Sequence, residues 1–162
     1  MPAGGLILGI DPGLASTGYG VVDAERLVAC GSVRTAPGSP GARLVSLVGQ
    51  LQLVLSRYAI AEAAMEELFM GRNRTSVIGV AQARGAILAC LESAGVRTFE
   101  YKPSQVKAVL TGYGSADKTQ VARMVALQLG LAAKPGDDHA SDALAIAVCH
   151  ARSRRLNAAA AR

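Results

Sequence analysis

The stretch Leu6–Val22, LILGIDPGLASTGYGVV, constrains the fold of this chain more than any other. Its first residues form an apolar run, broken by one glycine, that is typical of a strand buried on both faces of a sheet. This run ends at Asp11, a Pro-Gly pair turns the chain, and strand-like residues return from Ser16. The stretch predicts a hairpin whose first strand brings a carboxylate to the sheet edge. Asp is also a common turn residue, so this pattern leaves open whether Asp11 only caps the turn.

Strand-like and helix-like segments alternate along the rest of the chain. We expect strands at 27–33, 63–66 and 96–101, and helices at 44–58, from Thr75 or Ser76 to about Ala94, at 103–110, at 115–129, and from Asp137 or Asp138 to about Arg155. Short turns make the first three strands antiparallel, whereas helical crossovers make later neighbours parallel. The prediction is an α/β fold with one mixed five-stranded sheet and helices on both faces.

Length and composition fit one globular domain. The 162 residues are 51% hydrophobic and 18% charged, which allows one core but not two ordinary domains. We assign residues 1–156 to this domain and 157–162 to a frayed C-terminal tail. There is no apolar run of membrane-spanning length, no secretion signal, and no metal or redox spacing among the three cysteines. These features favour a cytoplasmic protein that does not contact a membrane.

The positive charge of the chain is unevenly distributed. Residues 1–66 carry four basic and five acidic side chains, whereas residues 67–162 carry thirteen basic and seven acidic ones. A basic excess confined to part of a globular domain suits a polyanionic partner such as nucleic acid. A net charge of +5 is also explained by solubility alone.

Acidic residues recur where apolar segments end. Glu66 ends its strand as Asp11 does, and if those strands are neighbours the two side chains start about 5 Å apart and need a cation between them. On the last helix, His139 and Asp142 are three residues apart and share a face, and Asp138 is an alternative to His139. Oxygen-rich ligand sets favour Mg²⁺ or Mn²⁺, and two such ions can promote phosphodiester hydrolysis.

Six motifs then occur in a fixed order: GIDPGLASTGYGVV, GQLQLVLSRY, MEELFMGRN, AQARGAI, GSADKTQV and SDALAIAVCH. Through them the chain resembles the RuvC family of bacterial Holliday-junction endonucleases over essentially its whole length. The resemblance implies a ribonuclease-H-like fold, a homodimer, and Mg²⁺-dependent nicking of two strands of a four-way DNA junction in recombination and repair. It also implies cooperation with the RuvA–RuvB branch-migration machinery.

The resemblance assigns the four metal-binding and catalytic positions to Asp11, Glu66, His139 and Asp142. Glu67, which follows the second acid, is the less suitable ligand. Many members of the family have an aspartate where this chain has His139. Because imidazole is a softer ligand than carboxylate, we expect Mn²⁺ to substitute for Mg²⁺ and to be preferred.

The resemblance also implies DNA contacts. Phe69 would stack against bases near the junction, although core packing is the simpler explanation from the sequence alone. Phosphate contacts are expected from Arg72, Asn73, Arg74, Lys107 and Lys118. Small residues on the helix before Ala94 would allow close approach of a second copy across a two-fold axis, and they are Ala81, Ala83, Gly85, Ala86 and Ala89.

Two other functions fit parts of the sequence. Actin-like and sugar-kinase ATPases also begin with a strand, an Asp and a glycine hairpin, but 162 residues leave no room for their second lobe. The stretch 112–119, GYGSADKT, lacks the glycine before lysine that a phosphate-binding loop needs. A junction-binding protein without catalytic activity is the other alternative, and the retained acids argue against it.

Overall fold

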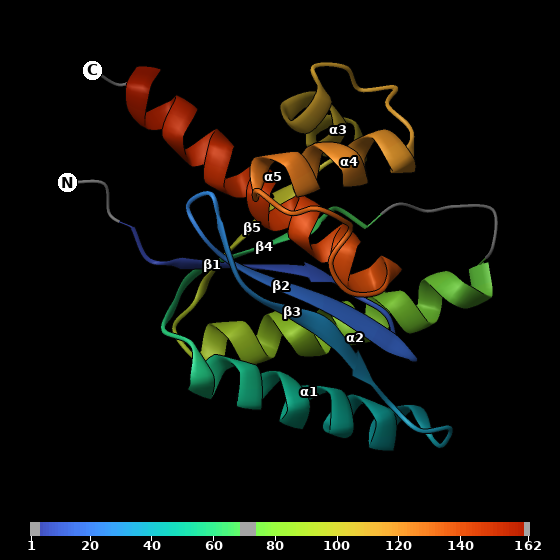
Figure 1. Cartoon of the computed structure of the whole chain (residues 1–162). Coiled ribbons are helices and arrows are strands. Elements are labelled where there is room, and N and C mark those ends of the chain that lie inside the picture. Colours follow the sequence, from blue (N-terminus) through green and yellow to red (C-terminus); the bar gives the residue numbers. More distant parts are fainter. Residues whose placement is uncertain (1–3, 69–73, 161–162) are drawn as a thin grey trace.

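The computed structural model describes residues 4–68 and 74–160, which form one five-stranded sheet and five helices (Figure 1). The elements are β1 (Leu6–Asp11), β2 (Ser16–Asp23), β3 (Arg26–Arg34), α1 (Pro40–Arg57), β4 (Ile60–Glu66), α2 (Arg74–Ser93), β5 (Arg97–Tyr101), α3 (Pro103–Thr111), α4 (Lys118–Gln128) and α5 (Asp138–Ala160). None of these helices is long and apolar enough to cross a membrane.

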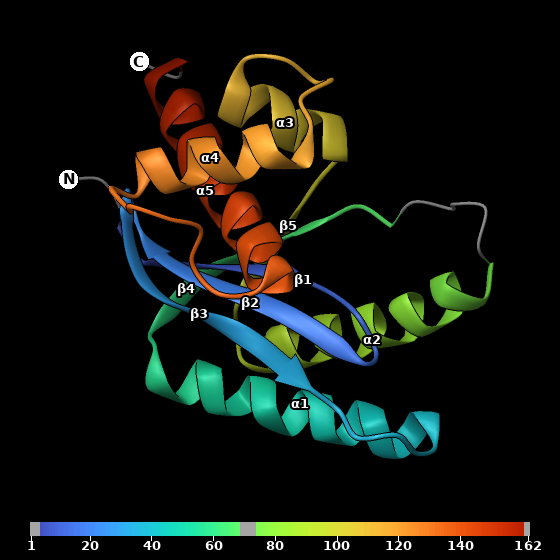
Figure 2. The ribbon, with the colours of Figure 1, turned by 45° about the vertical axis from the view of Figure 1, so that its right-hand side comes forward.

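The strands are arranged in the order β3-β2-β1-β4-β5. The pairs β1–β2 and β2–β3 are antiparallel, whereas β1–β4 and β4–β5 are parallel. In both ribbon views α1 and α2 lie on one side of the sheet and α3, α4 and α5 on the other (Figures 1 and 2). The predicted mixed sheet with helices on both faces is therefore confirmed.

Two hydrophobic layers flank the sheet because successive residues of a strand point to opposite faces. Leu8 and Ile10 of β1 pack toward α1 and α2, whereas Ile7 packs toward α5, and all three are fully buried. Burying a side chain of this size stabilises the fold by about 1.5–3 kcal/mol. The central strand is thus fixed from both sides, and with it the position of Asp11 at its end.

Glycines in β1 and β2 let α5 lie directly on the sheet. A methyl group added at Gly9 would lie 2.0 Å from the carbonyl oxygen of Ala143, and one added at Gly18 would lie 1.9 Å from that of His139. Both distances are far below van der Waals contact. Only the absence of a side chain at these positions allows the first turns of α5 to reach the ends of the strands.

A buried polar network joins β4, β5 and α5. The carboxylate of Glu62 accepts hydrogen bonds from Arg97 at 2.7 Å and Arg154 at 3.0 Å, and lies 3.0 Å from Nε2 of His150. The other ring nitrogen of His150 lies 2.6 Å from the hydroxyl of Tyr101. Burial lowers the pKa of His150, so its neutral ring donates to Glu62 and accepts from Tyr101. The network satisfies a carboxylate that would otherwise be buried without a partner.

Helix starts differ from the predicted ones. Helix α2 begins at Arg74, so Thr75 and Ser76 lie in its first turn rather than capping it. Helix α4 is capped by Asp117 and not by Ser115, because the Asp117 carboxylate accepts from the backbone N–H of Gln120 at 2.8 Å and the Gln120 side chain bonds back. Side-chain hydrogen bonds of this reciprocal kind decide a helix start that composition leaves ambiguous.

Helix α5 differs from expectation at its C-terminal end. Asp137 is the capping residue, since its carboxylate accepts from the N–H of Ala140 at 2.9 Å. The helix continues to Ala160 instead of ending near Arg155, so residues 157–160 are helical. The alanines in this segment have the highest intrinsic helix propensity, which accounts for the extension.

Candidate active site

The acids at the ends of β1 and β4 lie side by side. The two strands are adjacent and parallel, and Ile10 pairs with Met65. The residues that follow, Asp11 and Glu66, therefore reach the same edge of the sheet, as predicted for neighbouring strands. Both line a cavity of about 190 Å³ together with the start of α2.

Helix α5 adds a histidine to this edge. Nδ1 of His139 lies 2.9 Å from Oδ2 of Asp11. One turn later, Oδ2 of Asp142 lies 3.0 Å from Nζ of Lys118 at the start of α4. Asp138 instead pairs with Lys134, and its side chain is 69% exposed. The helical rotation thus turns His139 toward the strand ends and Asp138 away from them.

The carboxylates of the site disfavour one another's ionised forms. Burial raises the pKa of Asp11, an effect that the hydrogen bond from His139 opposes and the charge of Asp142 reinforces. Burial also raises the pKa of Glu66, and the charges of Asp11 and Asp142 add to the shift. Like charges gathered at a partly buried edge are stabilised when a cation lies among them.

Two lysines flank these carboxylates. The charge of Lys107, half-buried on α3, favours the ionised form of Glu66. The hydrogen bond to Asp142 raises the pKa of Lys118, so Lys118 stays protonated. Both lysines therefore lie beside these carboxylates, and the phosphate contacts expected of them stay predictions.

The remaining predicted DNA contacts lie between β4 and α2. Phe69, Arg72 and Asn73 fall outside the residues that the structure describes. Arg74 is the first residue of α2, and its side chain also falls outside the description. The roles predicted for these four residues stay predictions.

Arg84 of α2 also belongs to this site, although the sequence did not lead us to expect it there. Its guanidinium donates a hydrogen bond of 2.5 Å to the backbone carbonyl of Glu66 and pairs with the carboxylate of Glu100. The side chain is 9% exposed and lines the same cavity as Asp11. The signal was present in the sequence, since Arg84 stands four residues after Val80 on the apolar stripe of a helix. A charged residue at such a position needs buried partners.

The chemistry of this donor set fits hard divalent cations, because three carboxylates and one imidazole meet at one edge. In the described part of the chain, no three His, Cys, Asp or Glu side chains form a ready-made metal site. Instead, Asp11 lies against His139, and Asp142 pairs with Lys118. A bound cation would replace Lys118 as the partner of Asp142.

A mixed five-stranded sheet whose central parallel strands end in acids, faced by a helix with a further acid, defines the ribonuclease-H-like class. Comparison with known proteins narrows this class. The family model of crossover junction endodeoxyribonuclease RuvC matches residues 7–150. The chain belongs to the RuvC family, as the sequence motifs predicted, and family membership makes it an endonuclease that depends on divalent metal.

Individual relatives agree with this assignment. The RuvC of Chloroflexus aggregans is 48% identical over 149 residues, which cover 89% of this chain and 91% of that protein. The structure of Thermus thermophilus RuvC in complex with a Holliday junction substrate matches with a TM-score of 0.88 and 38% identity, covering 94% of this chain and 96% of the other. A yeast mitochondrial Holliday junction resolvase matches with a TM-score of 0.62 at 13% identity, which shows only a shared fold.

Proposed function

We propose that this protein resolves Holliday junctions by paired, metal-dependent hydrolytic nicks in two strands of like polarity. The family match supports the substrate, because a close structural relative binds a Holliday junction. The observation that most supports the chemistry is the meeting of Asp11 and Glu66 on adjacent strands, with His139 2.9 Å from Asp11. Donors brought together from three elements of the fold indicate a site built for a ligand rather than three separate caps.

Two Mg²⁺ ions held by Asp11, Glu66, His139 and Asp142 would supply an activated water and stabilise the leaving oxygen. The protein's own groups do the rest. A neutral His139 is required for coordination, and its imidazole is the reason to expect a preference for Mn²⁺. Lys118, which pairs with Asp142 in the absence of metal, would be released by the cation and would offer its ammonium to the scissile phosphate, while Lys107 balances the charge of Glu66.

The paired nicks call for a homodimer, in which two copies place two sites by symmetry. Helix α2 supports this arrangement. Ile78, Gly85 and Ala89 lie on its exposed side, and a methyl group at Gly85 would meet no atom within 4 Å. Ala83 is fully buried against the sheet, so the opposite side of α2 serves the core. Cooperation with the RuvA–RuvB complex is proposed from family membership.

Nicking of a synthetic four-way junction tests the proposal. Asp11→Asn, Glu66→Gln and Asp142→Asn are each expected to abolish nicking in Mg²⁺ and in Mn²⁺ while junction binding persists, because each removes one metal-binding charge. Asp138→Asn is the matched control, since its carboxylate pairs with Lys134 and faces away from the site. If the wild-type protein binds the junction but nicks it with neither metal, the chain is a non-catalytic binding protein. If it hydrolyses ATP, the family-based function fails altogether.

A further inference from the structure

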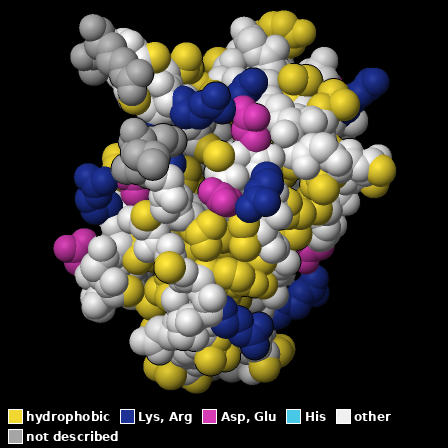
Figure 3. Space-filling model, turned by 60° about the vertical axis from the view of Figure 1, so that its left-hand side comes forward, with side chains coloured by type: hydrophobic (Ala, Val, Ile, Leu, Met, Phe, Trp, Pro, Cys, Tyr) yellow, Lys and Arg dark blue, Asp and Glu magenta, His cyan; other side chains and the backbone are white. Residues whose placement is uncertain are grey.

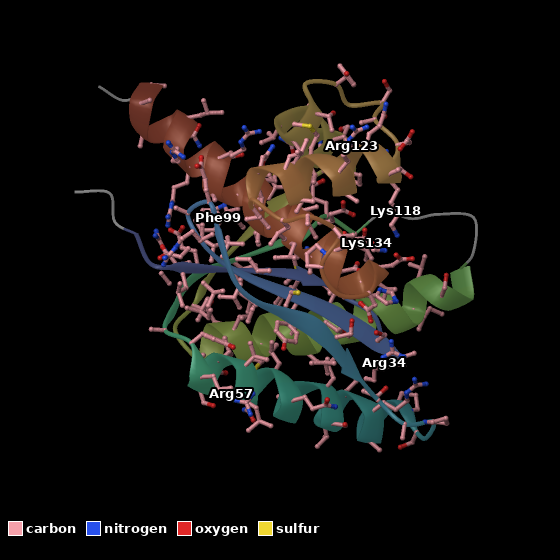
Figure 4. All side chains as sticks on the ribbon, in the orientation of Figure 1. Arg34, Arg57, Phe99, Lys118, Arg123 and Lys134 are labelled. Carbon is pink, nitrogen blue, oxygen red and sulfur yellow. The ribbon has the colours of Figure 1, made fainter. Side chains whose placement is uncertain are left out.

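A second cavity, of about 560 Å³, borders the active site. It lies between α4, the loop that leads to α5, and the first turn of α5. Its charged residues are three basic side chains, Lys118, Arg123 and Lys134, and one acid, Asp138, and four alanines form part of its wall. Figure 4 shows the three basic side chains on the same side of the molecule, projecting from α4 and the following loop.

Lys118 connects this cavity to the active site. Its ammonium lies 3.0 Å from Asp142, and the same side chain lines the cavity. A DNA strand whose scissile phosphate lies beside Lys118 continues in both directions with one phosphate per nucleotide. One of these directions leads from Lys118 into the cavity, whose other basic groups are Arg123 and Lys134.

Arg123 is available for such a contact. It is exposed and forms no ion pair with any described residue. Lys134 pairs with Asp138, and Lys118 pairs with Asp142. Among the described residues that line the cavity, the guanidinium of Arg123 is therefore the basic group without an acidic partner. A planar guanidinium offers several parallel donors, a geometry that matches two oxygens of one phosphate.

A second group of basic side chains lines another cavity and consists of Arg26, Arg154 and Arg155, but each of these arginines pairs with an acid. On the face presented in Figure 3, the Lys and Arg side chains are scattered, and several lie beside acidic side chains. Arg57, at the end of α1, lies far from the cavity in Figure 4, on the other side of the sheet. The alanine side chains of the lining are short and apolar, so they leave room for a sugar ring and form no hydrogen bond with it.

We propose that this cavity binds a backbone phosphate of the cleaved strand that flanks the scissile phosphate, with Arg123 as its main ligand and Lys134 as the second. The inference rests on the proposed function, because it follows the strand outward from the active site. It adds α4 and the loop before α5 to the predicted DNA-binding positions, most of which the family resemblance places in the sequence between β4 and α2.

The first test measures the binding of a four-way junction in EDTA, where no cleavage occurs, over a range of salt concentrations. Arg123→Gln is expected to weaken binding about fivefold and to lower the slope of log affinity against log salt by about one unit, the signature of one lost phosphate contact. Lys134→Gln should act in the same direction. Arg57→Gln, which removes an exposed arginine elsewhere, is the matched control and should change neither quantity. An unchanged slope for Arg123→Gln overturns the proposal.

The second test locates the phosphate. Junctions are made with a single uncharged methylphosphonate at each position flanking the cleavage point. The wild-type protein should lose affinity at one flanking position, and Arg123→Gln should be insensitive to the same replacement. Equal sensitivity of the two proteins at every position refutes the cavity as a phosphate site. Nicking by the wild-type protein is scored separately, so absence of nicking rejects the proposed function while the binding profile still decides the role of the cavity.

Discussion

Gly18→Ala should misplace His139, although it adds only one methyl group. Gly18 is the strand partner of Asp11, and the backbone of His139 lies directly over it. The new methyl group would lie 1.9 Å from the carbonyl oxygen and 2.2 Å from the carbonyl carbon of His139. This is roughly 1.5 Å short of an ordinary van der Waals contact. Both atoms belong to the backbone of α5, so no side-chain rotation can relieve the overlap.

The first turn of α5 must therefore move away from the sheet. The contact of 2.9 Å between His139 and Asp11 would then exceed hydrogen-bonding distance. A misplacement of about 1 Å in a catalytic group can lower the rate about 100-fold, and overpacking of this kind destabilises a fold by about 1–3 kcal/mol. We expect losses of that order in nicking rate and in the free energy of unfolding.

Junction nicking and urea denaturation measure the two effects. Gly20→Ala is the graded comparison, because its methyl group would meet mainly the movable side chain of Leu144, and it should cost stability with less loss of activity. Gly49→Ala, on α1 with no atom within 4 Å, should leave nicking unchanged and raise stability by about 0.5–1 kcal/mol. If Gly18→Ala nicks at the wild-type rate with unchanged stability, the close approach of α5 does not position the site.

Arg84→Gln should lower nicking about tenfold and raise the Mn²⁺ concentration needed for a given thermal shift, because Arg84 fixes the backbone of Glu66; an unchanged shift would contradict this role. Burial alone would raise the pKa of Glu62, but hydrogen bonds from His150 and Arg154 outweigh burial and lower this pKa below its ordinary value. Its stabilising contribution is therefore complete above the ordinary pKa of a glutamate and is lost as the pH falls through the lowered pKa of the folded protein, and Glu62→Gln should flatten the acid side of the stability curve obtained by urea titration. His139→Asp should keep nicking activity and shift the preference toward Mg²⁺, whereas His139→Ala should lose most activity and Asp138→Ala little; the reverse order would make Asp138 the ligand.

Local patterns were sufficient for most of the fold. The apolar run before Asp11 and the turn after it depend only on adjacent residues, and so do the glycines that end α2 and α3 in left-handed conformations. The expected strands and helices accordingly appear in the structure, with shifted ends. Helix ends were harder to predict from the sequence, because several nearby side chains can act as the cap. At α4 the cap is Asp117, whose carboxylate accepts from the N–H three residues later.

The sequence by itself determined the elements, the family, and the kinds of side chain at the site. It placed Asp11 and Glu66 at strand ends but left open whether the strands are neighbours, because hydrogen-bonded partners on parallel strands are far apart in the chain.

Only the tertiary structure decided how the other groups reach these acids. It turns His139 toward Asp11, places Lys118 against Asp142, and brings Arg84 under Glu66. Each contact joins elements distant in sequence, and its geometry depends on how closely a helix approaches the sheet. Glycines of the sheet, such as Gly9 and Gly18, set that approach because they have no side chain. The backbone atoms that fill the space above them belong to α5, which is distant in the sequence.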